Sequence, residues 1–237
     1  MDISVRDLRK SFHREGQAPL LVLDGVDLYI EHGEFVTLLG PTGCGKTTLL
    51  KIIAGIEKAD AGEIHPDPSR SKGSLPIIWQ EHRLLPWRTV LENIEFPLEL
   101  KNVESATAEN KVRSLLRLMG LEEFHNYYPW QLSGGMEQRV SIARALATDP
   151  ICLLMDEPFA SVDYQTQQRL FKEVQELHKR REITILYVTH DIRDAIKISD
   201  RIVILSKRPA RVREIIQPTS ADLPHSELEQ RIWQLLE

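Results

Sequence analysis

The sequence predicts an α/β fold in which a mostly parallel sheet carries helices on both faces. Two patterns along the 237 residues lead to this prediction. Apolar runs of strand length, such as 35–39 and 151–155, alternate with segments of helical periodicity, and this alternation is typical of parallel sheets. A helix-rich stretch over about 84–147 interrupts the alternation. We therefore expect an α/β core with an inserted α-helical subdomain.

The N-terminal part of the chain is expected to be rich in short strands. The predicted strands are ISVRDL, LLVLDGVDLYI and FVTLLG, at residues 3–8, 20–30 and 35–40. A helix is predicted soon after the third strand, because Leu49, Leu50 and Ile53 share one helical face. Gly55 is well placed to end that helix, since glycine tolerates the left-handed conformation common after a helix.

The rest of the chain continues the alternation. A helix is predicted over 104–119, with its apolar residues on one stripe and Gly120 at its end. We also predict helices over 135–147 and 164–181, strands over 151–155, 183–188 and 202–205, and a polar turn region over 65–74. Near the C-terminus, Ser226 and Glu229 fit a capping box that opens a short final helix.

Composition limits the function classes. A chain that is 42% hydrophobic can form one large domain over 1–237, here divided into a core (1–83 and 148–237) and a subdomain (84–147). A net charge of -5 argues against a nucleic-acid binder held by a basic surface. The two cysteines cannot form a disulfide framework, and no His or Cys pair has the spacing of a zinc site. Without a signal peptide or an apolar run near ~18 residues, we expect a soluble cytoplasmic chain.

The segment GPTGCGKTT has the spacing of a phosphate-binding loop, between a predicted strand and a predicted helix. Consecutive backbone N–H groups and the positive end of a helix attract a triphosphate, and the glycines let the backbone approach it. Lys46 would place a cation between the β- and γ-phosphates, and the Thr47 hydroxyl could ligate Mg²⁺. The predicted nucleotide-binding residues are Gly40, Pro41, Thr42, Gly43, Cys44, Gly45, Lys46, Thr47 and Thr48. A plain glycine-rich turn is the weaker interpretation, because four residue identities match at fixed spacing.

The segment ICLLMDEP supplies two carboxylates at the end of a predicted buried strand. Ligands in α/β sheets bind at the carboxyl ends of strands. Asp156 is suited to hold Mg²⁺ through water, and Glu157 is suited to orient or deprotonate an attacking water. Alone, this pattern is as compatible with a solvent-facing strand end, so its weight comes from the phosphate loop.

The segment LSGGMEQR predicts a second anion-binding helix terminus. Ser133 can cap the following helix, and Gly134 and Gly135 leave its first N–H groups uncovered. One triphosphate needs only one phosphate loop. A second anion site therefore suggests that two chains share each nucleotide, whereas an ordinary capped helix start is the simpler interpretation.

These motifs, together with Gln80 and the segment VTHD, occur in the order shown by ABC-type ATPases, which the chain resembles over almost its whole length. The resemblance implies a P-loop ATPase core with an N-terminal antiparallel β subdomain and an inserted α-helical subdomain, with ATP and Mg²⁺ as cofactors. It also implies a head-to-tail homodimer in which Ser133 and Gly135 of one chain contact the γ-phosphate bound by the other.

The same resemblance assigns roles to residues outside the phosphate loop. Gln80 would contact Mg²⁺ and the attacking water, and His190 would hold the γ-phosphate. Asp163 would reach across the dimer interface, and Phe12 would stack on adenine. Taken alone, His190 is as compatible with a capping or exposed histidine, and Phe12 with a core aromatic.

The stretch LLPWRTVLENIEFPLEL resembles most closely the ATPase subunits of nitrate, sulfonate and taurine importers. Such a subunit works on the cytoplasmic face of the inner membrane, beneath separate permease subunits and indirectly with a substrate-binding protein. Leu84, Leu85, Pro86 and Trp87 are predicted to form the surface that docks on the membrane subunit.

Other classes of protein fit fewer of these sequence features. An exporter subunit stays open as an alternative. A nucleic-acid- or ribosome-acting ABC ATPase usually carries two ATPase domains or a long coiled coil, and this chain has one copy of each motif and no heptad run. A P-loop kinase or GTPase-like switch would not need LSGGMEQR. The sequence favours an ATP-hydrolysing importer subunit for a small anion, without naming the solute.

Overall fold

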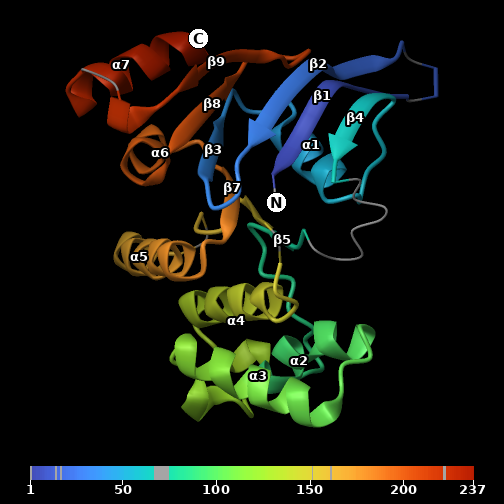
Figure 1. The fold of residues 1–237 in the computed structure, drawn as a ribbon, viewed down its shortest axis with the longest axis vertical. Coiled ribbons are helices and arrows are strands. Elements are labelled where there is room, and N and C mark those ends of the chain that lie inside the picture. Colours follow the sequence, from blue (N-terminus) through green and yellow to red (C-terminus); the bar gives the residue numbers. More distant parts are fainter. Residues whose placement is uncertain are drawn as a thin grey trace.

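The computed structural model describes residues 2–13, 15–16, 18–66, 75–150, 152–160, 162–220 and 223–237. Over these residues the chain forms two β-sheets with helices around them (Figure 1). The turn region predicted over 65–74 lies mostly outside the described residues, as does the first residue of the strand predicted over 151–155.

The larger sheet has six strands in the order β5-β6-β7-β3-β8-β9. The strands are β5 (Ile77–Ile78), β6 (Cys152–Asp156), β7 (Thr184–Val188), β3 (Phe35–Leu39), β8 (Arg201–Leu205) and β9 (Val212–Ile216). All neighbours pair in parallel except β9, which runs antiparallel to β8. The predicted mostly parallel sheet is confirmed, and the carboxyl ends of β6, β7 and β3 lie next to one another.

The two faces of the larger sheet pack into different apolar cores. In β7, Ile185 and Tyr187 face one core, and Leu186 and Val188 face the other, as the two-residue repeat of a strand requires. Every described residue of β3, β6 and β7 is buried, which explains the continuous apolar runs in the sequence. The second core also takes the apolar face of α1 (Lys46–Ile53).

The smaller sheet is antiparallel and comes from the N-terminal part of the chain. Its order is β2 (Leu20–Ile30), β1 (Ile3–Phe12) and β4 (Ala61–His65). Opposite an irregularity in β1, a Cβ at Gly62 would lie 2.6 Å from the carbonyl oxygens of Arg6 and Asp7, so only glycine fits there. The predicted N-terminal antiparallel β subdomain is confirmed, and it places Phe12 at the end of an ordered strand.

Three helices lie together on the far side of the larger sheet from the smaller one (Figure 1). They are α2 (Val90–Leu100), α3 (Ser105–Leu118) and α4 (Gly134–Leu146). α3 buries the predicted stripe, including Val112 and Leu115, and Gly120 follows it with φ +63°. The inserted α-helical subdomain is confirmed as part of the fold, and α4 joins it to the core beneath the larger sheet.

The remaining helices cover the C-terminal half of the larger sheet. α5 (Tyr164–Arg181) packs against the same core as α4. α6 (Ile192–Ile198) and α7 (His225–Leu236) pack against a third apolar cluster that includes Ile202 and Ile204 of β8. The structure contains the helix predicted after the phosphate loop. It also contains the helices predicted over 104–119, 135–147 and 164–181, each within one or two residues of the predicted bounds.

One predicted helix start is wrong. α7 begins at His225 with Pro224 before it, and Ser226 lies inside the first turn without a side-chain capping bond. Pro224 has a backbone angle suited to a helix start, which moves the boundary earlier. Glu229 accepts a hydrogen bond from Arg193 of α6 at 2.9 Å instead of closing a capping box.

Several elements were not predicted individually, namely α2, α6, β4 and β9. For α2 a signal was present, since Thr89 and Glu92 form a capping box at its start. Pro97 inside the helix obscured that signal.

Candidate active site

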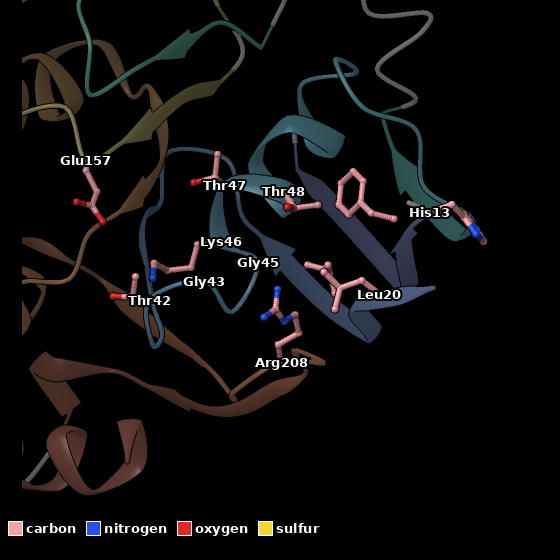
Figure 2. Close-up of a pocket in the computed structure, with 12 residues that line it drawn as sticks. His13, Leu20, Thr42, Gly43, Gly45, Lys46, Thr47, Thr48, Glu157 and Arg208 are labelled. Carbon is pink, nitrogen blue, oxygen red and sulfur yellow. The ribbon is translucent and has the colours of Figure 1, made fainter. Parts of the chain in front are cut away.

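A cavity of about 520 Å³ opens where β3 runs into α1 (Figure 2). Its lining combines the phosphate loop, the N-terminal sheet and two more distant loops: Phe12, His13, Leu20, Val22, Thr42, Gly43, Gly45, Lys46, Thr47, Thr48, Glu157 and Arg208. The cavity is thus polar at the phosphate loop and apolar at the smaller sheet. A nucleotide has the same two ends, a charged phosphate chain and a flat base.

The backbone of the phosphate loop needs its glycines. Gly43 has φ +75° and open space on its Cβ side, whereas a Cβ at Gly45, with φ +126°, would lie 2.9 Å from side chains of Val22 and Leu23. A Cβ at Gly40 would lie 2.8 Å from the Sγ of Cys44. Cys44 itself is buried, which raises the pKa of its thiol, so it serves as a small packing residue beneath the loop.

Lys46 is the first residue of α1 and is almost fully buried. Its Nζ donates hydrogen bonds to the carbonyl oxygens of Gly40, at 2.7 Å, and Pro41, at 3.2 Å. The ammonium group therefore lies inside the curve of the loop. Among the described residues, no side chain caps the start of α1. The positive end of the helix and the ammonium group both face the polar end of the cavity (Figure 2).

Thr47 and Asp156 meet beside the phosphate loop, although 109 residues separate them. The Thr47 hydroxyl donates to Asp156 Oδ1 at 3.2 Å. Burial raises the pKa of Asp156, and the bond from Thr47 opposes that rise. A hydroxyl and a carboxylate are oxygen ligands of the kind that Mg²⁺ prefers, so these two residues fit the predicted metal.

Glu157 is held in an unusual backbone conformation, with φ +47°. Its backbone N–H donates to Val188 O at 2.9 Å, which extends the pairing of β6 and β7 by one residue. Its carboxylate lies 2.9 Å from His190 Nδ1, while the His190 side chain is 70% exposed. A left-handed conformation outside glycine costs about 1–3 kcal/mol and is often kept at functional sites.

The helix predicted as a second anion site begins as expected. Ser133 precedes α4, and its Oγ accepts from the N–H of Met136 at 3.4 Å. A Cβ at Gly135 would lie 2.6 Å from Thr166 Cγ2 of α5, so Gly135 also permits close packing of the two helices. In the part of the chain that the structure describes, Ser133, Gly134 and Gly135 do not line the cavity. An anion bound at this helix start would therefore not be a phosphate of the nucleotide held in the cavity of the same chain.

Gly135→Ala separates the packing role of Gly135 from its predicted ligand role. We expect the variant to lose about 1–3 kcal/mol of unfolding free energy through overpacking against Thr166, and ATPase activity to fall by about tenfold or more. In Gly135→Ala/Thr166→Ser the clashing methyl group is gone while the hydroxyl stays. Thermal unfolding should then return to that of Thr166→Ser alone, and ATPase activity should stay low. Recovery of both would show that Gly135 serves packing only.

The other predicted residues have the following positions. Asp163 caps α5, accepting from the N–H groups of Gln165 and Thr166 at 3.1 Å each. A hydrogen bond from the Thr166 side chain, together with these N–H groups, lowers the pKa of Asp163. Gln80 is exposed just after β5, and it is not part of the cavity lining described above. Phe12 does line the cavity.

The predicted docking residues differ in exposure. Leu84 packs partly against the core, and the Leu85 backbone N–H donates to Asn93 Oδ1 at 2.8 Å. Pro86 is exposed, and Trp87 is 71% exposed. The outward surface of this stretch is therefore mainly Pro86 and Trp87.

Sequence patterns did not single out two features. His13 and Arg208 line the cavity, and neither belongs to one of the motifs described above. A second, mostly apolar groove of about 890 Å³ lies between α2, α4 and the start of β5, lined by Pro76, Ile77, Phe96, Pro97, Leu100, Lys101, Ser141, Arg144, Ala145 and Thr148. The available sequence signal for this groove was the four-residue spacing of Phe96 and Leu100, which places two large apolar side chains on one face of a helix.

A phosphate loop that opens a helix, with an Asp-Glu pair at the end of a nearby parallel strand, defines a P-loop nucleotide hydrolase. The comparison with protein families is more specific. The family model described as ABC transporter matches residues 23–160, and the chain belongs to this family. ATP is the nucleotide of these cassettes and Mg²⁺ their general cofactor, so the chain is an ABC-type ATPase whose hydrolysis is coupled to transport.

Curated relatives are similar over most of the chain. An aliphatic sulfonates import ATP-binding protein from Bacillus thuringiensis subsp. konkukian is 40% identical, with 99% of this chain and 93% of the relative covered. An uncharacterized ABC transporter ATP-binding protein from Methanocaldococcus jannaschii is 42% identical, with 91% and 81% covered. A spermidine/putrescine import ATP-binding protein from Thermotoga maritima is 42% identical, with 87% of this chain and 56% of the relative covered.

The solved structures agree with the family. The dimeric ATP-binding cassette MJ0796, in a post-hydrolysis state bound to ADP and Pi, superposes with a TM-score of 0.80. It is 31% identical, and the match covers 91% of this chain and 98% of that chain. No helix among the described residues is long and apolar enough to span a bilayer.

Proposed function

We propose that this chain is the ATP-hydrolysing subunit of an ABC importer for a small anion such as a sulfonate. It would act as a peripheral protein on the cytoplasmic face of the inner membrane, with separate permease subunits and, indirectly, a substrate-binding protein. The observation that supports binding to a membrane subunit is an exposed apolar surface near Gln80, formed by Trp87 and the groove beside α2. The sulfonate class rests on the relatives whose match covers nearly all of both chains.

The nucleotide would be shared by two copies of the chain. The cavity of one copy supplies Lys46 and the loop N–H groups, and the start of α4 in the other supplies Ser133 and Gly135. The dimeric cassette bound to ADP and Pi supports this arrangement, as does the position of α4 in the helical subdomain, apart from α1 (Figure 1). Asp163 would then lie at the interface, with its pKa lowered by hydrogen bonds from the Thr166 side chain and from the N–H groups that it caps.

The chemistry follows from the residues around the polar end of the cavity. Lys46 and the helix start would hold the β- and γ-phosphates, and Thr47 with Asp156 would hold Mg²⁺, which neutralises phosphate charge when bound. Glu157 would accept the proton of the attacking water at its carboxylate. His190, hydrogen-bonded to that carboxylate at 2.9 Å, would orient it and then contact the γ-phosphate. Gln80 would approach the same region as the subdomain of residues 84–147 closes.

The apolar groove offers a place for a short helix of the permease. Phe96, Pro97 and Leu100 form its apolar side, and Lys101 and Arg144 lie at its polar edge. If closure of the ATP-bound dimer moves this groove, the motion reaches the membrane subunit. ATP must bind the closed state better than the open one to drive such a change.

Trp87→Ala tests the membrane partner. We expect the variant to co-purify poorly with its permease subunit, because interface tryptophans often contribute about 2 kcal/mol or more. Nucleotide affinity of the isolated chain should stay unchanged. Trp233→Ala, which removes another exposed tryptophan, on α7, is the matched control. Wild-type assembly and transport in Trp87→Ala would show that this surface is not the docking site.

The direction of transport needs a separate observation. A gene for an external binding protein beside the permease gene would support import. A membrane subunit fused to its own ATPase would favour an exporter. Binding of this chain to ribosomes or nucleic acid, in place of a permease, would favour a non-transport ABC ATPase.

A further inference from the structure

The segment that follows Gln80 is fastened to α4 by the side chain of His82. Nδ1 of His82 lies 2.6 Å from Oε1 of Gln138, and Nε2 lies 3.6 Å from Oε2 of Glu137. The His82 side chain is only 13% exposed, and Gln138 is fully buried, so the contact between them is shielded from water. One imidazole therefore connects a surface segment with two consecutive residues of α4.

Arg144 fastens the backbone of the same segment. Its guanidinium donates to the carbonyl oxygen of Arg83 at 2.9 Å and to that of His82 at 3.1 Å. Arg144 also belongs to α4, six residues after Gln138. Arg83 has φ +48° and lies over the ring of Trp79 at 4.3 Å, so the segment bends tightly between β5 and α4.

Gln138 depends on this connection. It is fully buried, and its Nε2 has no hydrogen-bond partner among the described atoms. If the amide group of Gln138 is rotated by a half-turn, its Nε2 can donate a hydrogen bond to Nδ1 of His82. The imidazole proton of His82 then lies on its own Nε2, which faces Glu137. In either orientation His82 bonds the buried amide, and a buried amide without a partner is costly.

The connection joins two parts of the proposed site that serve different nucleotides. Gln80, two residues before His82, would act on the nucleotide bound by its own chain. Ser133 and Gly135, on the turn of α4 before Gln138, would act on the nucleotide bound by the partner. A helix transmits a shift along its axis because its backbone hydrogen bonds are continuous.

We propose that His82 is a positioning residue that makes the Gln80 segment and α4 move as one unit. This inference rests on the proposed function. Nucleotide arrival at Gln80 then shifts Ser133 and Gly135 toward the partner's nucleotide, so that each chain prepares its partner's site. Because such coupling is reciprocal, closure of the partner site also holds Gln80 in place.

The test uses the full-length chain with Glu157→Gln as the parent variant, in which ATP-driven dimers accumulate. We expect His82→Ala to raise the ATP concentration at half-maximal dimerisation by about tenfold, the loss expected for a buried hydrogen bond. ADP affinity of the isolated chain should stay within about twofold, since His82 does not line the nucleotide cavity. A general loss of structure would weaken ADP binding as well.

His82→Asn and His125→Ala complete the test. Asn can place an amide near the position of Nδ1, so dimerisation should return to within about threefold of the parent. His125 makes a similar Nδ1 contact, with Glu122 O at 2.8 Å, away from α4, so His125→Ala should match the parent. Parent-like dimerisation of His82→Ala overturns the inference, as does an equal loss of ADP binding. Failure of the parent itself to dimerise with ATP would instead overturn the proposed function.

Discussion

Glu157→Gln is expected to reduce ATP hydrolysis by about 10²–10⁴-fold, the loss typical when a general base is removed. ATP-driven dimerisation of the chain should persist. Gln has almost the same shape as Glu but cannot accept a proton at neutral pH. The backbone bond of residue 157 to Val188 O does not involve the side chain, so the fold around the site should not change.

The measurements are phosphate release and light scattering, each with and without ATP and Mg²⁺. Glu182→Gln is a matched control, because Glu182 also has a left-handed backbone, with φ +49°, but is exposed at the end of α5. That control should hydrolyse ATP like the wild type. Undiminished turnover in Glu157→Gln would show that another group activates the water. Loss of dimerisation together with hydrolysis would place Glu157 in nucleotide binding instead of catalysis.

The phosphate loop could be predicted because its geometry is local. Strand, loop and helix follow one another within 35–53, so residue spacing alone determines which groups face the phosphates. Asp156 and Glu157 are distant in sequence from the phosphate loop, yet their position at the end of a buried strand was enough to predict that they belong to the same site. The carboxyl ends of parallel strands lie at the same edge of a sheet. The structure agrees with this expectation, since Oδ1 of Asp156 lies 3.2 Å from the Thr47 hydroxyl oxygen.

The contacts between these groups could not be predicted. The bond between Glu157 and His190 depends on the register of β6 and β7, in which Asp156 pairs with Val188. No local pattern specifies that register. The same holds for Arg208, which enters the cavity from the loop between β8 and β9, an antiparallel strand pair that the sequence pattern did not reveal. Such positions are set by tertiary packing and not by residue spacing.

Buried polar residues on α4 were also invisible in the sequence. Gln138 and Ser141 are buried although their side chains are polar, and polar residue type alone does not predict burial. Their burial follows from the packing of α4 between α2, α5 and the segment after Gln80. Gly135 is a related case, since its role in anion binding was predicted and its close approach to Thr166 was not.

Lys46→Ala is expected to lower kcat/KM for ATP by about 10²–10³-fold, the range seen when a donor to developing charge is removed. The ammonium group has two roles that the variant removes together. It would neutralise phosphate charge, and it donates to the carbonyl oxygens of Gly40 and Pro41 inside the loop. Without it, those carbonyl dipoles would face the phosphates unopposed, so ADP affinity should fall as well.

Lys46→Met separates charge from packing, because it keeps a long apolar stem in the buried position of Lys46. We expect it to melt close to the wild type and to hydrolyse ATP as slowly as Lys46→Ala. Lys51→Ala is the matched control, since it removes a lysine from the last turn of the same helix, 5.8 Å from the ring of Trp79. Isothermal titration with ADP and ATP, with phosphate release, measures both effects. ATP affinity in Lys46→Met equal to that of Lys51→Ala would mean that the loop N–H groups hold the phosphates without the cation.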